Sequence, residues 1–206
     1  MSALSLLDYA SVFIFALTGA LAASRAQLDI IGFAFLASLT AVGGGTLRDL
    51  MLDRDPVFWV ANPEHIGIAC LAAILIFFTA HRFESRARLL LWLDAMALGV
   101  AVAAGVGVAL ELRFGWPVVL MMGVMTGTFG GLMRDVVANE VPMVLRQGEL
   151  YVSAALGGAA MALVVAYFSS SSLVIYGSSV LSTFVLRAGS ITFGWRLPVY
   201  KARPPR

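Results

Sequence analysis

The chain has 206 residues, of which 60% are hydrophobic and 13% are charged, and its formal net charge is +2. Ordinary soluble domains are about 45–50% apolar, so a mean hydropathy of +0.91 excludes that class and indicates an integral membrane protein. The apolar residues form long continuous runs instead of short alternating segments, which excludes a transmembrane β-barrel and predicts helices.

Charged residues gather between the apolar runs, so the membrane helices can be counted along the chain. We expect helices in the runs at residues 9–24, 30–47, 66–80, 89–110, 114–133 and 150–186. The last run is too long for one crossing, and the four serines at residues 169–172 divide it in two. The predicted fold class is therefore an all-α membrane protein with seven transmembrane helices, in one domain of residues 1–206.

The second half of this pattern repeats the first at an offset of 86 residues. The matched positions are Asp8 with Asp94, Gly19 with Gly105, Thr40 with Thr126, Gly44 and Gly45 with Gly130 and Gly131, Arg48 and Asp49 with Arg134 and Asp135, and Pro56 with Pro142. We place repeat one at about residues 8–80, repeat two at about 92–168, and a seventh helix outside the duplication at about 173–191. Because each repeat has three helices, the second copy enters the membrane from the opposite side, as in pathways that open to both faces.

The distribution of basic residues predicts the orientation. Three of the 14 Lys and Arg side chains fall on the side of the N-terminus, and the other 11, including those of the tail at Lys201, Arg203 and Arg206, fall on the opposite side. By the positive-inside rule, the N-terminus lies outside and the C-terminus lies in the cytoplasm.

Glycines interrupt the second and fifth expected helices, in GGGTLRDL at residues 43–50 and GGLMRDVV at residues 130–137. Each glycine weakens a helix by about 1 kcal/mol relative to alanine. One interpretation is that both helices kink there, and that the freed carbonyls line a water-filled route. Threonine hydroxyls would line it as well, at Thr40, Thr46, Thr126 and Thr128. The other interpretation is close helix packing, for which Gly123, Gly127 and Gly131 form a ladder of small residues.

An Arg-Asp pair follows the glycines in both repeats, as Arg48 with Asp49 and Arg134 with Asp135. A charge near the bilayer centre costs about 2.5–3.5 kcal/mol on insertion scales, so these four side chains need partners or water. Three interpretations are open: the pairs set the electrostatics of the route, they lie at the membrane interface, or the arginine of one repeat pairs with the aspartate of the other as a structural lock.

The remaining polar residues form no catalytic set. Asp8 and Asp94 open the first helix of each repeat, where we expect them to be ordinary N-terminal charges stabilised by the helix dipole. Cys70 is the single cysteine, and the chain has no nucleophile, metal-ligand or phosphate-binding motif. We expect no enzyme activity, no cofactor, no metal site and no nucleic-acid partner. Permeant potassium or sodium and bound membrane lipid are the ligands that the chain can take.

The twin GG-x-x-RD motifs, the proline after each, the inverted repeat and the ending LRAGSITFGWRLPVY resemble the bacterial branch of the trimeric intracellular cation channel family, whose repeated domain is also labelled a glycine-transporter domain. The resemblance covers about residues 8–200. It implies a homotrimer in the bacterial inner membrane, with a pore in each subunit that passes monovalent cations such as potassium. By this resemblance the pore is lined by the second and fifth helices, kinked at Gly43, Gly44, Gly45, Gly130 and Gly131. Phe129 stands where repeat one has Gly43, so we expect it to narrow or gate its half of the pore.

Three functions compete on this basis. A passive cation channel is the expected one, because the glycines come late in their helices and offer carbonyl ends, which favour a cation. The alternative is a secondary transporter of glycine or another small solute, since inverted repeats with broken helices serve both functions. A non-conducting scaffold would leave the duplicated charges unexplained.

Overall fold

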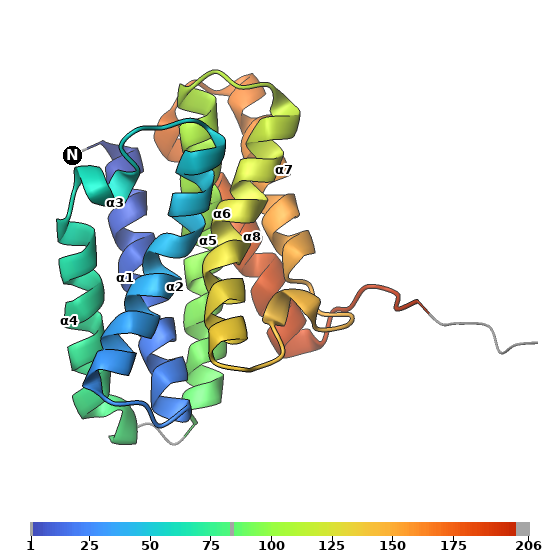
Figure 1. Cartoon of the computed structure of the whole chain (residues 1–206). Coiled ribbons are helices and arrows are strands. Elements are labelled where there is room, and N and C mark those ends of the chain that lie inside the picture. The colour runs from blue at the N-terminus through green and yellow to red at the C-terminus, as the bar shows by residue number, and fades with distance from the viewer. Residues whose placement is uncertain (1, 83–84, 201–206) are drawn as a thin grey trace, which may run out of the picture.

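The computed structural model describes residues 2–82 and 85–200, and within these ranges the chain is helical (Figure 1). The helices are α1 (Ala3–Arg25), α2 (Ile30–Met51), α3 (Phe58–Ala61), α4 (Glu64–Thr79), α5 (Arg86–Glu111), α6 (Trp116–Val137), α7 (Val152–Phe168) and α8 (Ser172–Phe193). Short 3-10 turns lie at Ala80–Arg82 and Met143–Leu145. No strand forms in the described ranges, where Glu149 and Arg196 make an isolated antiparallel bridge. The all-helical prediction is confirmed.

Six helices are long and apolar enough to cross a membrane: α1, α2, α4 with the turn that extends it to Arg82, α5, α6 and α8. The seventh, α7, is apolar but has only 17 residues, fewer than the roughly 20 that span about 30 Å of hydrocarbon. The structure thus supports a multi-span helical membrane protein, and the crossing by α7 remains a prediction. The tail residues that contribute to the expected orientation, Lys201, Arg203 and Arg206, lie outside the described residues.

The offset of 86 residues recurs in the backbone. The two 22-residue helices α2 and α6 begin and end at equivalent positions. Left-handed turns follow the matched helices at Gln27 (φ 56°) and Arg113 (φ 59°), and again at Asp53 (φ 54°) and Asn139 (φ 55°). In Figure 1, α1 and α5 run in opposite directions along the bundle, as do α2 and α6. Equivalent residues of the two repeats therefore lie at opposite ends of the bundle.

Helices α1, α2, α5 and α6 pack against one another, α4 packs on α1 and α2, and α7 and α8 pack on the side of α5 (Figure 1). Small residues make these contacts close. A Cβ atom at Gly19 would lie 2.6 Å from the carbonyl oxygen of Leu36, and one at Gly99 would lie 3.0 Å from that of Val180. Without a hydrophobic driving force in lipid, such close backbone packing is a main source of helix association.

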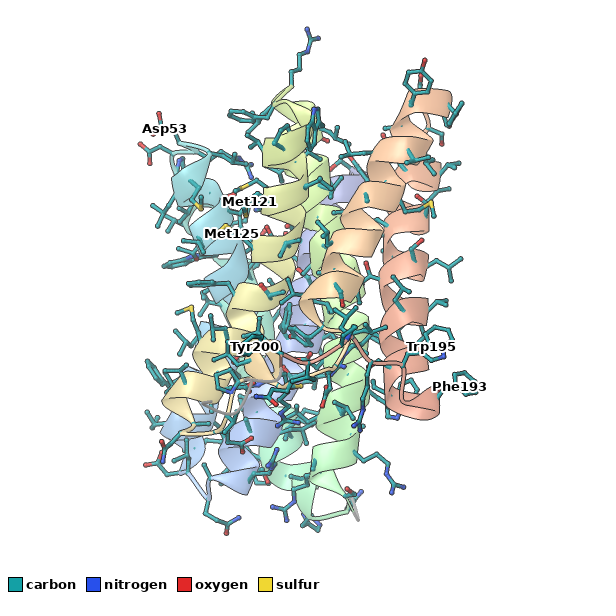
Figure 2. The ribbon with its side chains drawn as sticks, turned by 90° about the vertical axis from the view of Figure 1, so that its right-hand side faces the viewer. Asp53, Met121, Met125, Phe193, Trp195 and Tyr200 are labelled. Carbon is teal, nitrogen blue, oxygen red and sulfur yellow. The ribbon has the colours of Figure 1, made fainter. Side chains whose placement is uncertain are left out.

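The chain after α8 contacts the loop between α6 and α7. Gly194 takes the left-handed conformation (φ 68°) that ends the helix, and the amide of Leu197 donates a hydrogen bond of 2.9 Å to the carbonyl of Gly148. Figure 2 shows this segment, from Trp195 to Tyr200, in front of the bundle, and in Figure 1 it leads away from the helices. The loop between α6 and α7 is thereby tied to the end of α8.

Candidate functional site

Helices α2 and α6 cross at the glycines that the sequence singled out. A Cβ atom at Gly44 would overlap the backbone carbonyl of Thr126, and one at Gly130 would overlap that of Thr40. These two contacts are equivalent under the repeat, so the crossing lies on the pseudo-twofold axis. Both helices are continuous through the glycines, and the expected interruption of the helix is not seen. The glycines allow two backbones to approach, which is the close-packing interpretation.

The other glycines of the motifs lie against side chains. A Cβ atom at Gly43 would lie 2.7 Å from the sulfur of Met133, and one at Gly45 would lie 2.5 Å from the ring of Phe58. In the second repeat, a Cβ atom at Gly131 would lie 2.9 Å from the hydroxyl of Tyr151. Every glycine of the two motifs is thus buried against a neighbour within the subunit.

Around Arg48 the first charged cluster forms. This side chain is fully buried, and its Nη1 contacts Asp8 at 3.1 Å while its Nε donates to Asp49 Oδ1 at 2.7 Å. The same carboxylate oxygen accepts from Arg54 Nη1 at 3.0 Å, and the other oxygen accepts from the backbone amide of Phe58 at 2.8 Å. Asp49 therefore holds the short helix α3 against the end of α2.

The second cluster has the same plan around Arg134, which is also fully buried. Its Nη1 donates to Asp94 Oδ1 at 2.8 Å and its Nε donates to Asp135 Oδ1 at 2.8 Å. The other oxygen of Asp135 accepts from the amide of Met143 at 2.9 Å. One contact joins the repeats: Arg134 Nη1 donates to the hydroxyl of Thr18 at 2.9 Å. The equivalent position in repeat two is an alanine, so Arg48 has no such partner.

Two interpretations of the charges are corrected by this geometry. Each arginine pairs with carboxylates of its own repeat, so the lock between Arg48 and Asp135, or between Arg134 and Asp49, is not formed. Asp8 lies in the second turn of α1, and Asp94 lies in the third turn of α5. Both bind arginine instead of capping a helix N-terminus.

A cavity lies beside each cluster, at opposite ends of the bundle. We call the first, of about 370 Å³, vestibule one; its lining includes Ser5, Asp8, Arg54, Phe58, His65 and Glu111. The second, of about 390 Å³, is vestibule two, and its lining includes Arg25, Ala87, Arg88, Glu140, Met143 and Arg146. Each vestibule thus reaches the residue whose backbone amide binds the aspartate of the adjacent Arg-Asp pair.

A central cavity of about 10 Å³ lies next to the crossing, and its lining includes Gly44, Gly45, Arg48 and Thr126. That volume is about enough for one water molecule. It shares Asp8 and Phe58 with vestibule one. The hydroxyl of Thr126 has no hydrogen-bond partner within the described residues, so it is a free polar group at the smallest of the three cavities.

Other threonines of the predicted site have partners. Thr46 donates to the carbonyl of Val42 at 2.7 Å and accepts from Trp59 Nε1 at 2.9 Å, and Thr128 donates to the carbonyl of Val124 at 2.9 Å. Phe129 is half-buried and lines neither the vestibules nor the central cavity. Its role as a constriction remains a prediction.

A third arginine is buried, although no pattern in the sequence predicts it. Arg187 of α8 is fully buried, contacts Glu149 at 3.0 Å, and lies over the ring of Tyr151 with its Cζ 5.0 Å from the centroid. It lies outside the duplication, so no repeated partner pointed to it. Within residues 2–82 and 85–200, no three His, Cys, Asp or Glu side chains come together as metal ligands.

Comparisons with known proteins agree on one family. The family model described as glycine transporter matches twice, at residues 5–82 and 91–167. A UPF0126 membrane protein of Vibrio cholerae is 38% identical over 97% of this chain and 83% of its own length. The inner membrane protein YadS of Escherichia coli K12 is 36% identical over 94% of both chains.

Solved structures give the same result. The trimeric intracellular cation (TRIC) channel orthologue from Rhodobacter sphaeroides is 42% identical, covers 94% of this chain and 100% of its own, and superposes with a TM-score of 0.90. A TRIC cation channel whose structure concerns the basis of conductance is 28% identical to this chain. The match covers 99% of this chain and 100% of the other, with a TM-score of 0.86. A prokaryotic TRIC channel in 0.5 M KCl is 27% identical over 93% and 96%, with a TM-score of 0.85.

Proposed function

The chain belongs to the trimeric intracellular cation channel family, and from that premise we propose that it conducts monovalent cations, potassium among them, through each subunit. The observation that carries the proposal is the pair of vestibules that approach the α2–α6 crossing from opposite ends of the bundle. A buried ion-pair cluster stands between each vestibule and the crossing.

The route runs from vestibule one past Asp8 and Arg48 to the central cavity, crosses α2 and α6 beside Thr126, and passes Arg134 to vestibule two. The charge of the second cluster on this route suits a cation. The first cluster has two arginines and two aspartates, and the second has Arg134 against Asp94 and Asp135, which leaves one excess negative charge. Excess carboxylate charge at a narrow point favours cations over anions there.

In this conformation the route is closed, because the central cavity holds about one water and the two glycine contacts hold α2 and α6 together. Conduction requires these helices to separate at the crossing. The glycines suit such a movement, since a backbone contact without side chains can open with little repacking. The two helices separate at these glycines, which also allow each helix to bend there.

We further propose that the protein is a homotrimer in the bacterial inner membrane, with the N-terminus outside and the C-terminus in the cytoplasm. The R. sphaeroides relative is described as trimeric, and the E. coli relative is described as an inner membrane protein. The exposed apolar side chains of α4, α6 and α8 provide surface for other subunits and for lipid.

The test is potassium flux from vesicles that contain the purified protein. A potassium gradient should drive flux with the wild-type chain, and replacing both Asp94 and Asp135 by asparagine should reduce it more than it reduces the amount of folded protein. Equal flux in protein-free vesicles would refute the channel.

A second candidate is a transporter of a small solute such as glycine. The observation that favours it is that the two vestibules are separate cavities, as in a carrier that opens to one side at a time. Saturable uptake of labelled glycine, without discrete electrical openings, would support this candidate over the channel.

A further inference from the structure

The walls of the two vestibules contain oppositely charged residues that are related by the repeat with their signs exchanged. Arg25, at the end of α1, is equivalent to Glu111, at the end of α5. Arg54, after α2, is equivalent to Glu140, after α6. Repeat one thus supplies both arginines and repeat two supplies both glutamates, so Arg25 with Glu140 and Arg54 with Glu111 are two equivalent attractive pairs that join the repeats.

In the structure only one of these pairs is formed. Arg25 Nη2 contacts Glu140 Oε1 at 3.1 Å and joins the end of α1 to the segment after α6, in the wall of vestibule two. Arg54 and Glu111 both line vestibule one, but Arg54 binds Asp49 at 3.0 Å. Glu111 is exposed and forms no salt bridge with a described residue. The ion pair between equivalent positions is therefore formed in vestibule two and not formed in vestibule one.

Inverted repeats give a physical reason for this difference. When the two repeats of such a protein exchange conformations, the result is a second structure in which each contact moves to the equivalent residues at the other face. The contact between Arg25 and Glu140 would then become one between Glu111 and Arg54. Because both residues of the pair change sign, the attraction survives the exchange; a change of sign at only one of them would have turned it into repulsion.

We propose that these two pairs are alternative latches, with Arg25–Glu140 holding vestibule two and Arg54–Glu111 holding vestibule one, so that formation of one accompanies release of the other. This inference rests on the proposed cation pathway, and it identifies the two ion pairs as the contacts that control whether the pathway opens. In the present conformation the latch of vestibule two is made.

The local chemistry allows Arg54 to move between acceptors. When it leaves Asp49, that carboxylate keeps the Nε of Arg48 on one oxygen and the amide of Phe58 on the other. Glu111 in turn faces water and is free to accept a partner. The side chains of Arg25, Glu140 and Arg54 are 34%, 26% and 36% exposed, so water replaces each lost contact. Partly exposed ion pairs are weak, which keeps the two latched states close in free energy.

A charge-exchange cycle tests the latches through channel opening. Glu140→Gln removes the latch that is formed in the closed conformation, so it should raise the open probability in bilayers by about threefold, the size expected from losing one partly exposed ion pair. Glu111→Gln removes the alternative latch and should lower the open probability by a similar factor. The exchanged variant Arg25→Glu with Glu140→Arg should return it to the wild-type value. Failure of the exchange to restore it, with the protein still folded, would overturn the latch at vestibule two.

Thiol labelling gives a second test that does not depend on conduction. Cys70 is the single cysteine, so in a Cys70→Ser background Ser5→Cys reports on vestibule one and Ala87→Cys reports on vestibule two. With a neutral thiol reagent, Glu140→Gln should speed labelling at position 87 and slow it at position 5, and Glu111→Gln should do the reverse. Arg146→Gln, which removes a charge from vestibule two at a residue that is neither in a latch nor next to position 87, should change neither rate.

Opposite changes at the two positions would establish the exchange. Independent changes, or none, would overturn it. A wild-type protein that conducts no ions would refute the proposed channel, and the labelling rates would still decide whether the two latches alternate.

Discussion

Gly44 of α2 packs directly against the backbone carbonyl of Thr126 in α6, so closely that a Cβ atom at position 44 would overlap the oxygen. The equivalent residues Gly130 and Thr40 make the same contact on the other side of the crossing. This relationship explains why positions 44 and 130 are glycines, and it locates the point where the two repeats meet.

Replacing Gly44 by alanine should destabilise the subunit. A methyl group at this crossing forces the backbones apart, and overpacking of this kind costs about 1–3 kcal/mol. The matched control is Gly67→Ala in α4, where a Cβ atom would meet nothing within 4 Å. There the substitution should stabilise the helix by up to about 1 kcal/mol. Thermal unfolding in detergent would measure both, and equal effects at the two positions would contradict the crossing.

Arg134 should couple to Asp94 and not to Asp49. Breaking a buried ion pair by removing one partner costs about 3–5 kcal/mol, so Arg134→Gln should lower stability strongly. Adding Asp94→Asn should cost much less than Asp94→Asn alone, because the partner is already gone. Adding Asp49→Asn should cost its full single-variant amount, since that residue belongs to the other cluster. Additivity for both combinations would refute the pairing within repeats.

The hydroxyl of Thr126 should matter for conduction and not for stability. Thr126→Val keeps the shape but removes the free polar group from the narrowest cavity. We expect lower unitary conductance with thermal stability equal to or above that of the wild type, because the hydroxyl that is removed has no partner. Thr128→Val is the comparison, because it removes a hydroxyl that donates to the carbonyl of Val124 and lines none of the cavities on the route; its conductance should match the wild type. A Thr126→Val channel that conducts normally would remove this side chain from the route.

Basic side chains at vestibule two should repel entering cations. Arg88 is exposed and lines this vestibule, so Arg88→Gln should raise unitary potassium conductance at low salt, by about twofold. The increase should vanish at about 1 M salt, where the screening length falls to roughly 3 Å. Arg82→Gln, which removes an exposed arginine that does not line vestibule two, should have no effect. An increase that persists at high salt would point to a steric cause.

Much of the fold could be predicted because hydropathy and the repeat act over many residues. The uncharged runs of the sequence coincide with the six helices that are long enough to span a membrane. The offset of 86 residues also relates the helix ends and the left-handed turns of the two repeats. Partners of the buried arginines were harder to predict. Asp8 and Arg48 are 40 residues apart, and no sequence pattern says that they meet. Their joint recurrence as Asp94 and Arg134 was the signal that could have paired them.

Two features could not be derived from local preference. Glycine weakens an isolated helix, but at the α2–α6 crossing both helices are continuous through the glycines, and the kink there stays a prediction. Arg187 follows a long apolar run, where an arginine is typical of a loop at the membrane interface. Only the fold of the α6–α7 loop, which brings Glu149 and Tyr151 to it, reveals a buried partner.

The most direct test of the cation channel is a recording from the purified protein in a planar bilayer under a potassium chloride gradient. We predict discrete openings whose current reverses near the potassium equilibrium potential, and the same recording with Asp94→Asn and Asp135→Asn should reverse nearer to zero. A current that reverses near the chloride equilibrium potential, or a silent bilayer with correctly folded protein, would contradict the channel proposed here.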